Sequence, residues 1–247
     1  MILLYKTYVV EYEHINGRHN QTILLLHGWG GNMDSFAKVK KIFKSHYNML
    51  SISFPPLNLY KTKTDSIVPL NMYDYKNIAL NILQLLNLKS VIIICHSFGF
   101  RVALMLTTSN IIIDKVIVTG GAGIRFKPNF FKKLNQQFNS IFLKHHPEYF
   151  SKVASNEYIT LSPVDRQTFK NVVNKDLTGY IKNLTCQAFL FWGDKDHATP
   201  IKILKIIKNL KPYIKSKIIK NGTHFCYLDH SELFIDCCDK FLKGELC

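Results

Sequence analysis

The feature that most constrains the fold of this chain is an alternation of short apolar runs with longer amphipathic segments. The runs TILLL (22–26), SVIIIC (90–95) and CQAFLFWG (186–193) are almost continuously apolar, as strands buried on both faces are. Between them lie stretches of helical periodicity, such as 74–88, where Leu and Ile recur three and four residues apart. The pattern predicts an α/β protein with a mostly parallel sheet covered by helices on both faces.

This alternation breaks once, between Arg125 and Asn183, where no β-rich run occurs and aromatic residues recur at helical spacing. We expect a short helical cap over 125–183, inserted into a core domain made of 1–124 and 184–247. Outside the runs already named, we expect strands at 7–15, 47–54, 114–121 and 214–221, and helices at 33–46, from 97 onward, at 200–211 and at 231–242.

Composition excludes several classes of protein. The 247 residues suit one compact core, and no apolar run approaches the roughly 20 residues of a membrane helix. The N-terminal residues do not resemble a signal peptide, and the six cysteines show no metal-ligand spacing, so we expect a cytoplasmic protein with buried, reduced thiols. The net charge of +15 fits either an acidic partner or a lysine-rich composition, and no nucleic-acid-binding motif accompanies it.

The stretch VIIICHSFGF (91–100) predicts a strand that turns sharply into a helix, with Ser97 at the turn. Ser97 is either a nucleophile or only a helix N-cap. A nucleophilic serine needs a base, a carboxylate that orients the base, and donors for the oxyanion. Gly99 suits a tight turn of this kind, and Cys95 stands two residues before the serine, where a small residue is also needed.

Three distant segments offer the missing groups. Asp194 and Asp196 follow the apolar strand that ends at Gly193, and His224 follows the next predicted strand. The glycine-rich loop after TILLLHG can aim the Trp29 N–H at a substrate carbonyl, together with the Phe98 N–H at the turn. Because parallel strands collect functional groups at their carboxyl ends, we expect these residues to meet at one edge of the sheet.

Taken together, these motifs resemble the α/β-hydrolase superfamily, in its order and approximate spacing. The resemblance implies Ser97 as nucleophile, His224 as base and Asp196, three residues after Gly193, as the acid in preference to Asp194. It also implies structural roles for His27 and His96, while His145, His146 and His230 have no motif support. The matching segments are HGWGG (27–31), CHSFG (95–99), WGDKDHATP (192–200) and NGTHFCYLDHSELF (221–234).

The implied chemistry is hydrolysis of a carboxylic ester or thioester through an acyl-enzyme, with no cofactor and no metal. The HGWG motif and short cap are similar to pimeloyl-acyl-carrier-protein methyl ester esterases of biotin synthesis, which implies that Trp29 lines an acyl pocket. An acidic carrier protein would then suit the basic cap residues Arg125, Lys127, Lys132, Lys133, Lys144 and Lys152.

Two alternatives stay open at this stage. The first is a lyase of the same fold in menaquinone synthesis, which carries an arginine four residues after the serine, as Arg101 does here. The second is a non-catalytic binding protein. The sequence leaves open whether the protein is a monomer or a dimer.

Overall fold

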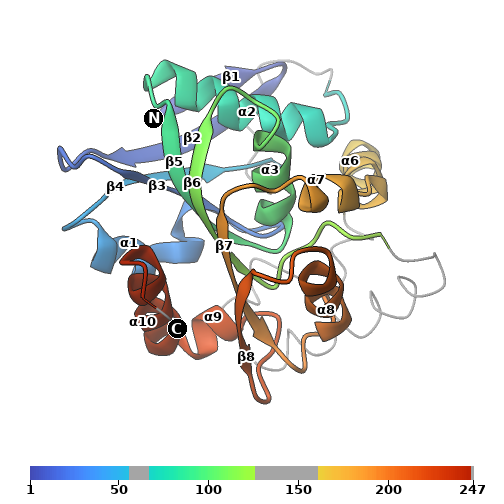
Figure 1. Ribbon diagram of the computed structural model, residues 1–247. Helices are drawn as coiled ribbons and strands as arrows, with labels where there is room; N and C mark the ends of the chain where they lie inside the picture. Colours follow the sequence, from blue (N-terminus) through green and yellow to red (C-terminus); the bar gives the residue numbers. More distant parts are fainter. Residues whose placement is uncertain (56–66, 126–160, 246–247) are drawn as a thin grey trace.

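The computed structural model describes residues 1–55, 67–125 and 161–245. Its centre is an eight-stranded sheet in the order β1-β2-β4-β3-β5-β6-β7-β8 (Figure 1). The strands are β1 (Ile2–Tyr5), β2 (Tyr8–Ile15), β3 (Thr22–Leu26), β4 (Asn48–Ser53), β5 (Ser90–His96), β6 (Ile112–Thr119), β7 (Gln187–Gly193) and β8 (Lys215–Ile219).

The sheet is parallel from β4 through β8, and antiparallel only where β1 pairs with β2 and β2 with β4. Every residue of β3 and β4 is buried, and so is every residue of β5 and β7 after the first. Strands buried on both faces have no polar side, which explains their unbroken apolar sequences. The predicted class, a mostly parallel sheet between two layers of helices, is confirmed.

Two hydrophobic clusters lie on opposite faces of the sheet. One contains buried side chains of α2 (Met72–Leu85), α3 (Phe98–Leu106), α7 (Thr178–Lys182) and α8 (Ile201–Leu210). The other contains those of α1 (Ala37–Phe43), α9 (Cys226–Asp229) and α10 (Ser231–Leu242), which Figure 1 shows on the other side of the strands. Two further elements are the 3₁₀ turn η1 (Met33–Phe36) and α6 (Pro163–Asn174).

The expected cap (125–183) is described only in part. Its residues from 161 onward form α6 and α7, and residues 126–160 lie outside the described part of the chain. Arg101 of α3 fastens this segment to the core, because its guanidinium donates to the carbonyls of Val172 (3.0 Å) and Lys175 (2.8 Å) at the C-terminal end of α6. The division into core and cap stays a prediction.

The cysteines follow the expectation with one exception. Cys95, Cys186, Cys226 and Cys238 are free, and burial raises the pKa of each of these thiols. Cys237 is disulfide-bonded, so the expectation that all six thiols are reduced is wrong for this residue.

Within the described residues, no helix has both the length and the apolar character that a bilayer crossing requires.

Candidate active site

Ser97 occupies a strained turn between β5 and α3. Its backbone has φ +48° and ψ −108°, a combination that non-glycine residues rarely adopt and that costs about 1–3 kcal/mol. The Ser97 side chain makes no capping hydrogen bond to the helix, so the N-cap interpretation does not explain why a serine stands here. Strain of this kind persists when the surrounding structure enforces it, and it is typical of functional positions.

Close backbone packing enforces this turn. A Cβ atom on Gly99 would lie 2.1 Å from the Leu26 carbonyl oxygen, so only glycine lets α3 approach the end of β3. Cys95 fills the position two residues before the serine, where a small residue is needed. Its fully buried Sγ points toward β6 and lies 3.5 Å from the Ile117 carbonyl oxygen. The backbone N–H of Ser97 donates to Thr119 at the end of β6, which fixes the turn to the neighbouring strand.

Asp196 and His224 form a buried pair, with 2.8 Å between Asp196 Oδ2 and His224 Nδ1. Asp196 follows β7 and is 3% exposed, and His224 follows β8 and is 6% exposed. Asp194 has an exposed side chain, and its backbone N–H donates to the Ile219 carbonyl. The structure thus pairs His224 with the aspartate that the resemblance selected.

Ser97 lies at the same edge of the sheet as this pair. The Thr119 carbonyl accepts the Ser97 N–H, and Gly120 follows Thr119 directly. A Cβ atom on Gly120 would lie within about 3 Å of both His224 and Asp196. Ser97, Asp196 and His224 therefore follow the carboxyl ends of the parallel strands β5, β7 and β8, respectively. This is the edge where parallel sheets place their functional groups.

The backbone N–H groups of Trp29 and Phe98 are candidate oxyanion donors. Phe98 is the first residue of α3, where an N–H has no partner inside the helix. Across the described part of the chain, neither N–H has a hydrogen-bond acceptor. Two such donors next to a helix N-terminus favour a developing negative charge.

The Trp29 side chain belongs to an aromatic cluster beside the turn. Its ring packs edge-on against Phe98 (5.4 Å between centroids) and against Phe169 of α6 (5.3 Å). Tyr75 lies 4.8 Å from Phe98 in the same cluster. Trp29 is only partly buried, unlike Phe98.

His27 and His96 are structural, as the resemblance implied. His27 Nε2 accepts from the Phe54 N–H (2.8 Å), so Nδ1 carries the hydrogen and donates to the Gly28 carbonyl (2.6 Å). Burial lowers the pKa of His27 to about 4, which keeps it neutral. Burial, and then the charge of His224, lower the pKa of His96 well below its ordinary value; its Nε2 lies 3.1 Å from the His224 carbonyl.

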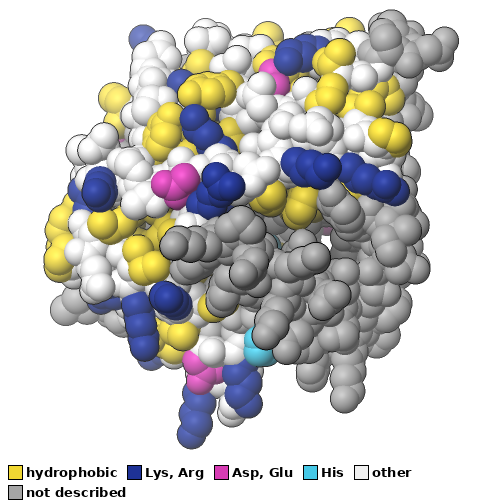
Figure 2. Space-filling model, turned by 90° about the vertical axis from the view of Figure 1, so that its right-hand side faces the viewer, with side chains coloured by type: hydrophobic (Ala, Val, Ile, Leu, Met, Phe, Trp, Pro, Cys, Tyr) yellow, Lys and Arg dark blue, Asp and Glu magenta, His cyan; other side chains and the backbone are white. Residues whose placement is uncertain are grey.

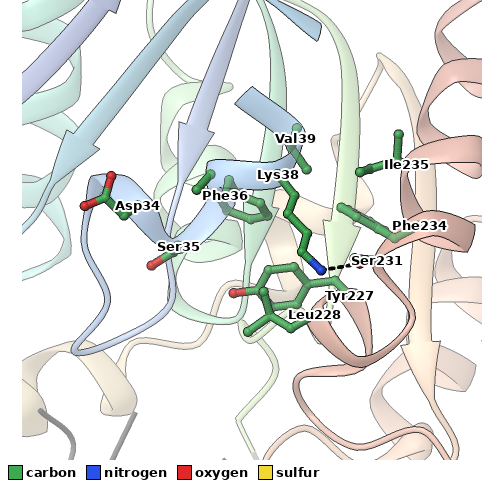
Figure 3. A pocket seen from close by; sticks show the side chains of 11 residues that line it. Asp34, Ser35, Phe36, Lys38, Val39, Tyr227, Leu228, Ser231, Phe234 and Ile235 are labelled. Carbon is green, nitrogen blue, oxygen red and sulfur yellow. Dashed lines mark hydrogen bonds between the residues drawn. The ribbon is translucent and has the colours of Figure 1, made fainter. Parts of the chain in front are cut away.

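A small pocket lies on the face of the sheet that is covered by α1, α9 and α10. It is bordered by η1 and α1 on one side and by α9 and α10 on the other (Figure 3). Its volume is about 80 Å³, well below the roughly 300 Å³ at which ligand sites begin. Lys38 spans it and donates to the Ser231 hydroxyl (2.9 Å). The pocket contains none of the residues predicted for the site.

No group of three or more potential metal ligands occurs within the described ranges.

The sequence interpretation missed two residues around the pair. Thr199 hydrogen-bonds Asp196, and Gly120 borders both the carboxylate and the imidazole. A polar residue three positions after the acid was a signal for the first. The second could not be found, because its importance depends on the approach of three strands that are distant in sequence.

Proteins similar to this chain include hydrolases and an esterase. No protein-family model matches the chain. It is 23% identical over 221 residues to the uncharacterized hydrolase YugF of Bacillus subtilis (strain 168), which covers 79% of this chain and 80% of that protein. It is 29% identical over 68 residues to the pimeloyl-[acyl-carrier protein] methyl ester esterase of Legionella pneumophila (strain Paris), a match that spans only 28% of each chain.

Among solved structures, an esterase from Exiguobacterium antarcticum superposes with a TM-score of 0.77 at 18% identity, covering 96% of each chain. Identity at this level shows the fold alone. The fold that the resemblance implied, that of the α/β-hydrolases, is confirmed over nearly the whole chain.

Proposed function

We propose that this chain, an α/β-hydrolase by fold, is a serine esterase that cleaves a carboxylic ester or thioester through an acyl-enzyme. The observation that carries the proposal is the buried 2.8 Å contact between Asp196 and His224, at the sheet edge where the strained turn presents Ser97. A base oriented by a carboxylate is what a serine hydroxyl needs to become a nucleophile.

The proposed reaction has two halves. His224 removes the Ser97 hydroxyl proton while Oγ attacks the carbonyl carbon, and the Trp29 and Phe98 N–H groups stabilise the oxyanion. Collapse of this intermediate breaks the ester bond, and the imidazolium returns the proton to the departing alcohol or thiol. Water, deprotonated by His224, then attacks the acyl-enzyme, releases the acid and restores the serine.

The lyase alternative is disfavoured by the position of Arg101. Arg101 is 4% exposed, and its guanidinium is bonded to two backbone carbonyls of the α6 segment. Burial lowers its pKa to about 10, with Asp176 opposing that shift, so it remains a cation at neutral pH. An arginine buried and bonded in this way ties α6 to α3, a structural role that requires no contact with a substrate.

A non-catalytic binding role does not account for the strain at Ser97. A scaffold would gain stability by replacing a serine held at positive φ, and it would not need a buried carboxylate–histidine pair. The structure retains both features at the same sheet edge, which favours an enzyme.

The finer assignment we propose is a methyl ester carried by an acidic acyl carrier protein. Support comes from the short match to the Legionella esterase and from the position of Trp29 between Phe98 and Phe169, where it can border an acyl chain. Of the six basic cap residues named from the sequence, Arg125 is described and exposed, and the other five lie outside the described residues: Lys127, Lys132, Lys133, Lys144 and Lys152.

The basic charge itself is widely spread. In Figure 2, dark blue Lys and Arg side chains are scattered over the face shown, and few magenta side chains accompany them. The compartment we propose is the cytoplasm, as expected from an N-terminal sequence that does not resemble a signal peptide.

A probe and a substrate panel test the proposal. A fluorophosphonate should label the protein at Ser97, and Ser97→Ala should lose both labelling and hydrolysis, by about 10⁴-fold or more in kcat, while circular dichroism stays unchanged. Esters of increasing acyl length, free and carrier-linked, then define the substrate. Normal turnover by Ser97→Ala would refute the mechanism.

The dependence of kcat/KM on salt concentration tests whether an acidic carrier protein is the partner. Attraction between opposite charges is screened over about 8 Å at physiological ionic strength, so kcat/KM for a carrier-linked ester should fall as salt rises, while a free ester of the same acyl chain stays nearly constant. Reversal of the charges of Lys132 and Lys133 should reproduce the selective loss. Equal salt responses would leave a small free ester as the substrate.

A further inference from the structure

The Asp196 carboxylate is held by more than His224. Its Oδ1 accepts the backbone N–H groups of Ala198 (2.9 Å) and Thr199 (2.7 Å). Its Oδ2 receives His224 Nδ1 (2.8 Å) and the Thr199 hydroxyl (2.7 Å). A carboxylate offers about four lone-pair sites, so these four donors saturate it.

The Thr199 hydroxyl has one hydrogen and two competing acceptors. Its Oγ1 lies 2.7 Å from Asp196 Oδ2 and 2.9 Å from the Gly120 carbonyl oxygen, while His224 Nδ1 lies 3.2 Å away. Hydrogen bonds to a charged acceptor are shorter and roughly twice as strong as neutral ones. The hydroxyl hydrogen of Thr199 therefore points to Asp196 Oδ2, the same oxygen that accepts from His224 Nδ1.

Thr199 is itself fixed in place. It is 4% exposed, and its carbonyl accepts the indole N–H of the fully buried Trp192 at 2.8 Å. Pro200 follows directly as the N-cap of α8, which fixes the backbone on the other side. With its backbone anchored from both directions, Thr199 keeps its hydroxyl within reach of Asp196.

We propose that Thr199 is a positioning residue that sets the strength of the Asp196–His224 hydrogen bond. A second donor on Oδ2 withdraws electron density from that oxygen and weakens its hold on the Nδ1 hydrogen of His224. It also fixes the plane of the carboxylate, and so the direction in which the imidazole faces. The inference rests on the triad role proposed above, but the hydrogen bond it concerns exists whether or not the enzyme turns over.

Thr199→Val tests this, because valine keeps the shape of threonine and removes only the hydroxyl. Without the second donor, the Nδ1 hydrogen should be drawn closer to Oδ2, and its downfield ¹H NMR resonance should move further downfield. The kcat should fall about tenfold, as expected for one lost hydrogen bond to a charged group, while KM changes less than about twofold. Thr199→Ser, which keeps the hydroxyl, should restore the wild-type resonance and kcat.

A purely structural Thr199 predicts a different result: a lower melting temperature, with the resonance and kcat of the folded protein unchanged. That result would overturn the inference. If Thr199→Val fails to fold, Thr199→Ala removes the same hydroxyl from a smaller side chain and decides the question by the same two measurements. Activity retained by Ser97→Ala would refute the proposed function separately, since the resonance does not require turnover.

Discussion

Gly120 lies against His224 so closely that a Cβ atom on the glycine would be 2.9 Å from His224 Nδ1. Its φ of +53° is also in the left-handed region that side chains avoid. Gly120→Ala should therefore displace the imidazole and reduce kcat by about 10²-fold, the usual effect of a small misplacement at a reacting centre. Gly179→Ala is the matched control, because that glycine has open space around it. Equal activity of the two variants would contradict the geometry.

The two neighbouring aspartates should behave differently. Asp196→Asn removes the acceptor that orients His224, and kcat should fall by about 10⁴-fold. Asp194→Asn alters an exposed side chain and should leave kcat within about a factor of two, since surface substitutions have small effects. Steady-state kinetics on one ester compare them, and a reversed ranking would reassign the acid.

Trp29 should control acyl length without controlling the chemistry, because its ring borders Phe98 and Phe169 while the proposed donor is its backbone N–H. Trp29→Ala should raise KM for long-chain esters and leave kcat for acetyl esters nearly unchanged. Tyr213→Ala, which alters a side chain that is 63% exposed, is the control. If acetyl ester turnover collapses as well, the indole has a role in the chemistry.

Buried neutral histidines should make stability depend on pH. The pKa of His27 is lowered to about 4, so between pH 6.5 and about 4 the unfolded chain binds a proton that the folded chain does not. The free energy of unfolding should therefore fall with decreasing pH, by up to about 1.4 kcal/mol per pH unit from this group. His96, whose pKa is also lowered, acts in the same direction.

Urea denaturation at several pH values measures this slope. His27→Gln removes one titrating group and should make the slope shallower below pH 6.5, whereas His46→Gln, at an exposed position, should not. A slope that is identical in wild type and His27→Gln would mean that His27 is protonated in the folded protein.

Local sequence was sufficient for most of the fold, because the central strands are almost continuously apolar. β1 was missed because Ile2–Tyr5 is a short edge strand with two exposed residues, which carries little periodic signal. α9 was missed because four residues are too few to establish a helical period. Both elements are defined mainly by what they pack against.

The site was predicted in part for a similar reason. Ser97, Asp196 and His224 each follow a recognisable strand, so their chain order could be read directly. Thr199 lies three positions after Asp196, so a local signal for it existed. Gly120 meets Asp196 and His224 from the end of a different strand, and no local pattern encodes that contact. Arg101 was visible in the sequence, but only the structure shows that it binds the end of α6.

The contact between Gly99 and Leu26 has a consequence for engineering. It holds the start of α3 against the end of β3 through main-chain atoms alone, and the two proposed oxyanion donors, Phe98 and Trp29, lie within a few residues of it. The spacing of these donors is therefore set by the main chain and not by the partly buried Trp29 side chain. A library randomised at Trp29 alone should change substrate scope and keep the catalytic frame, whereas Phe98 is a core side chain, 3% exposed, and should be left in place.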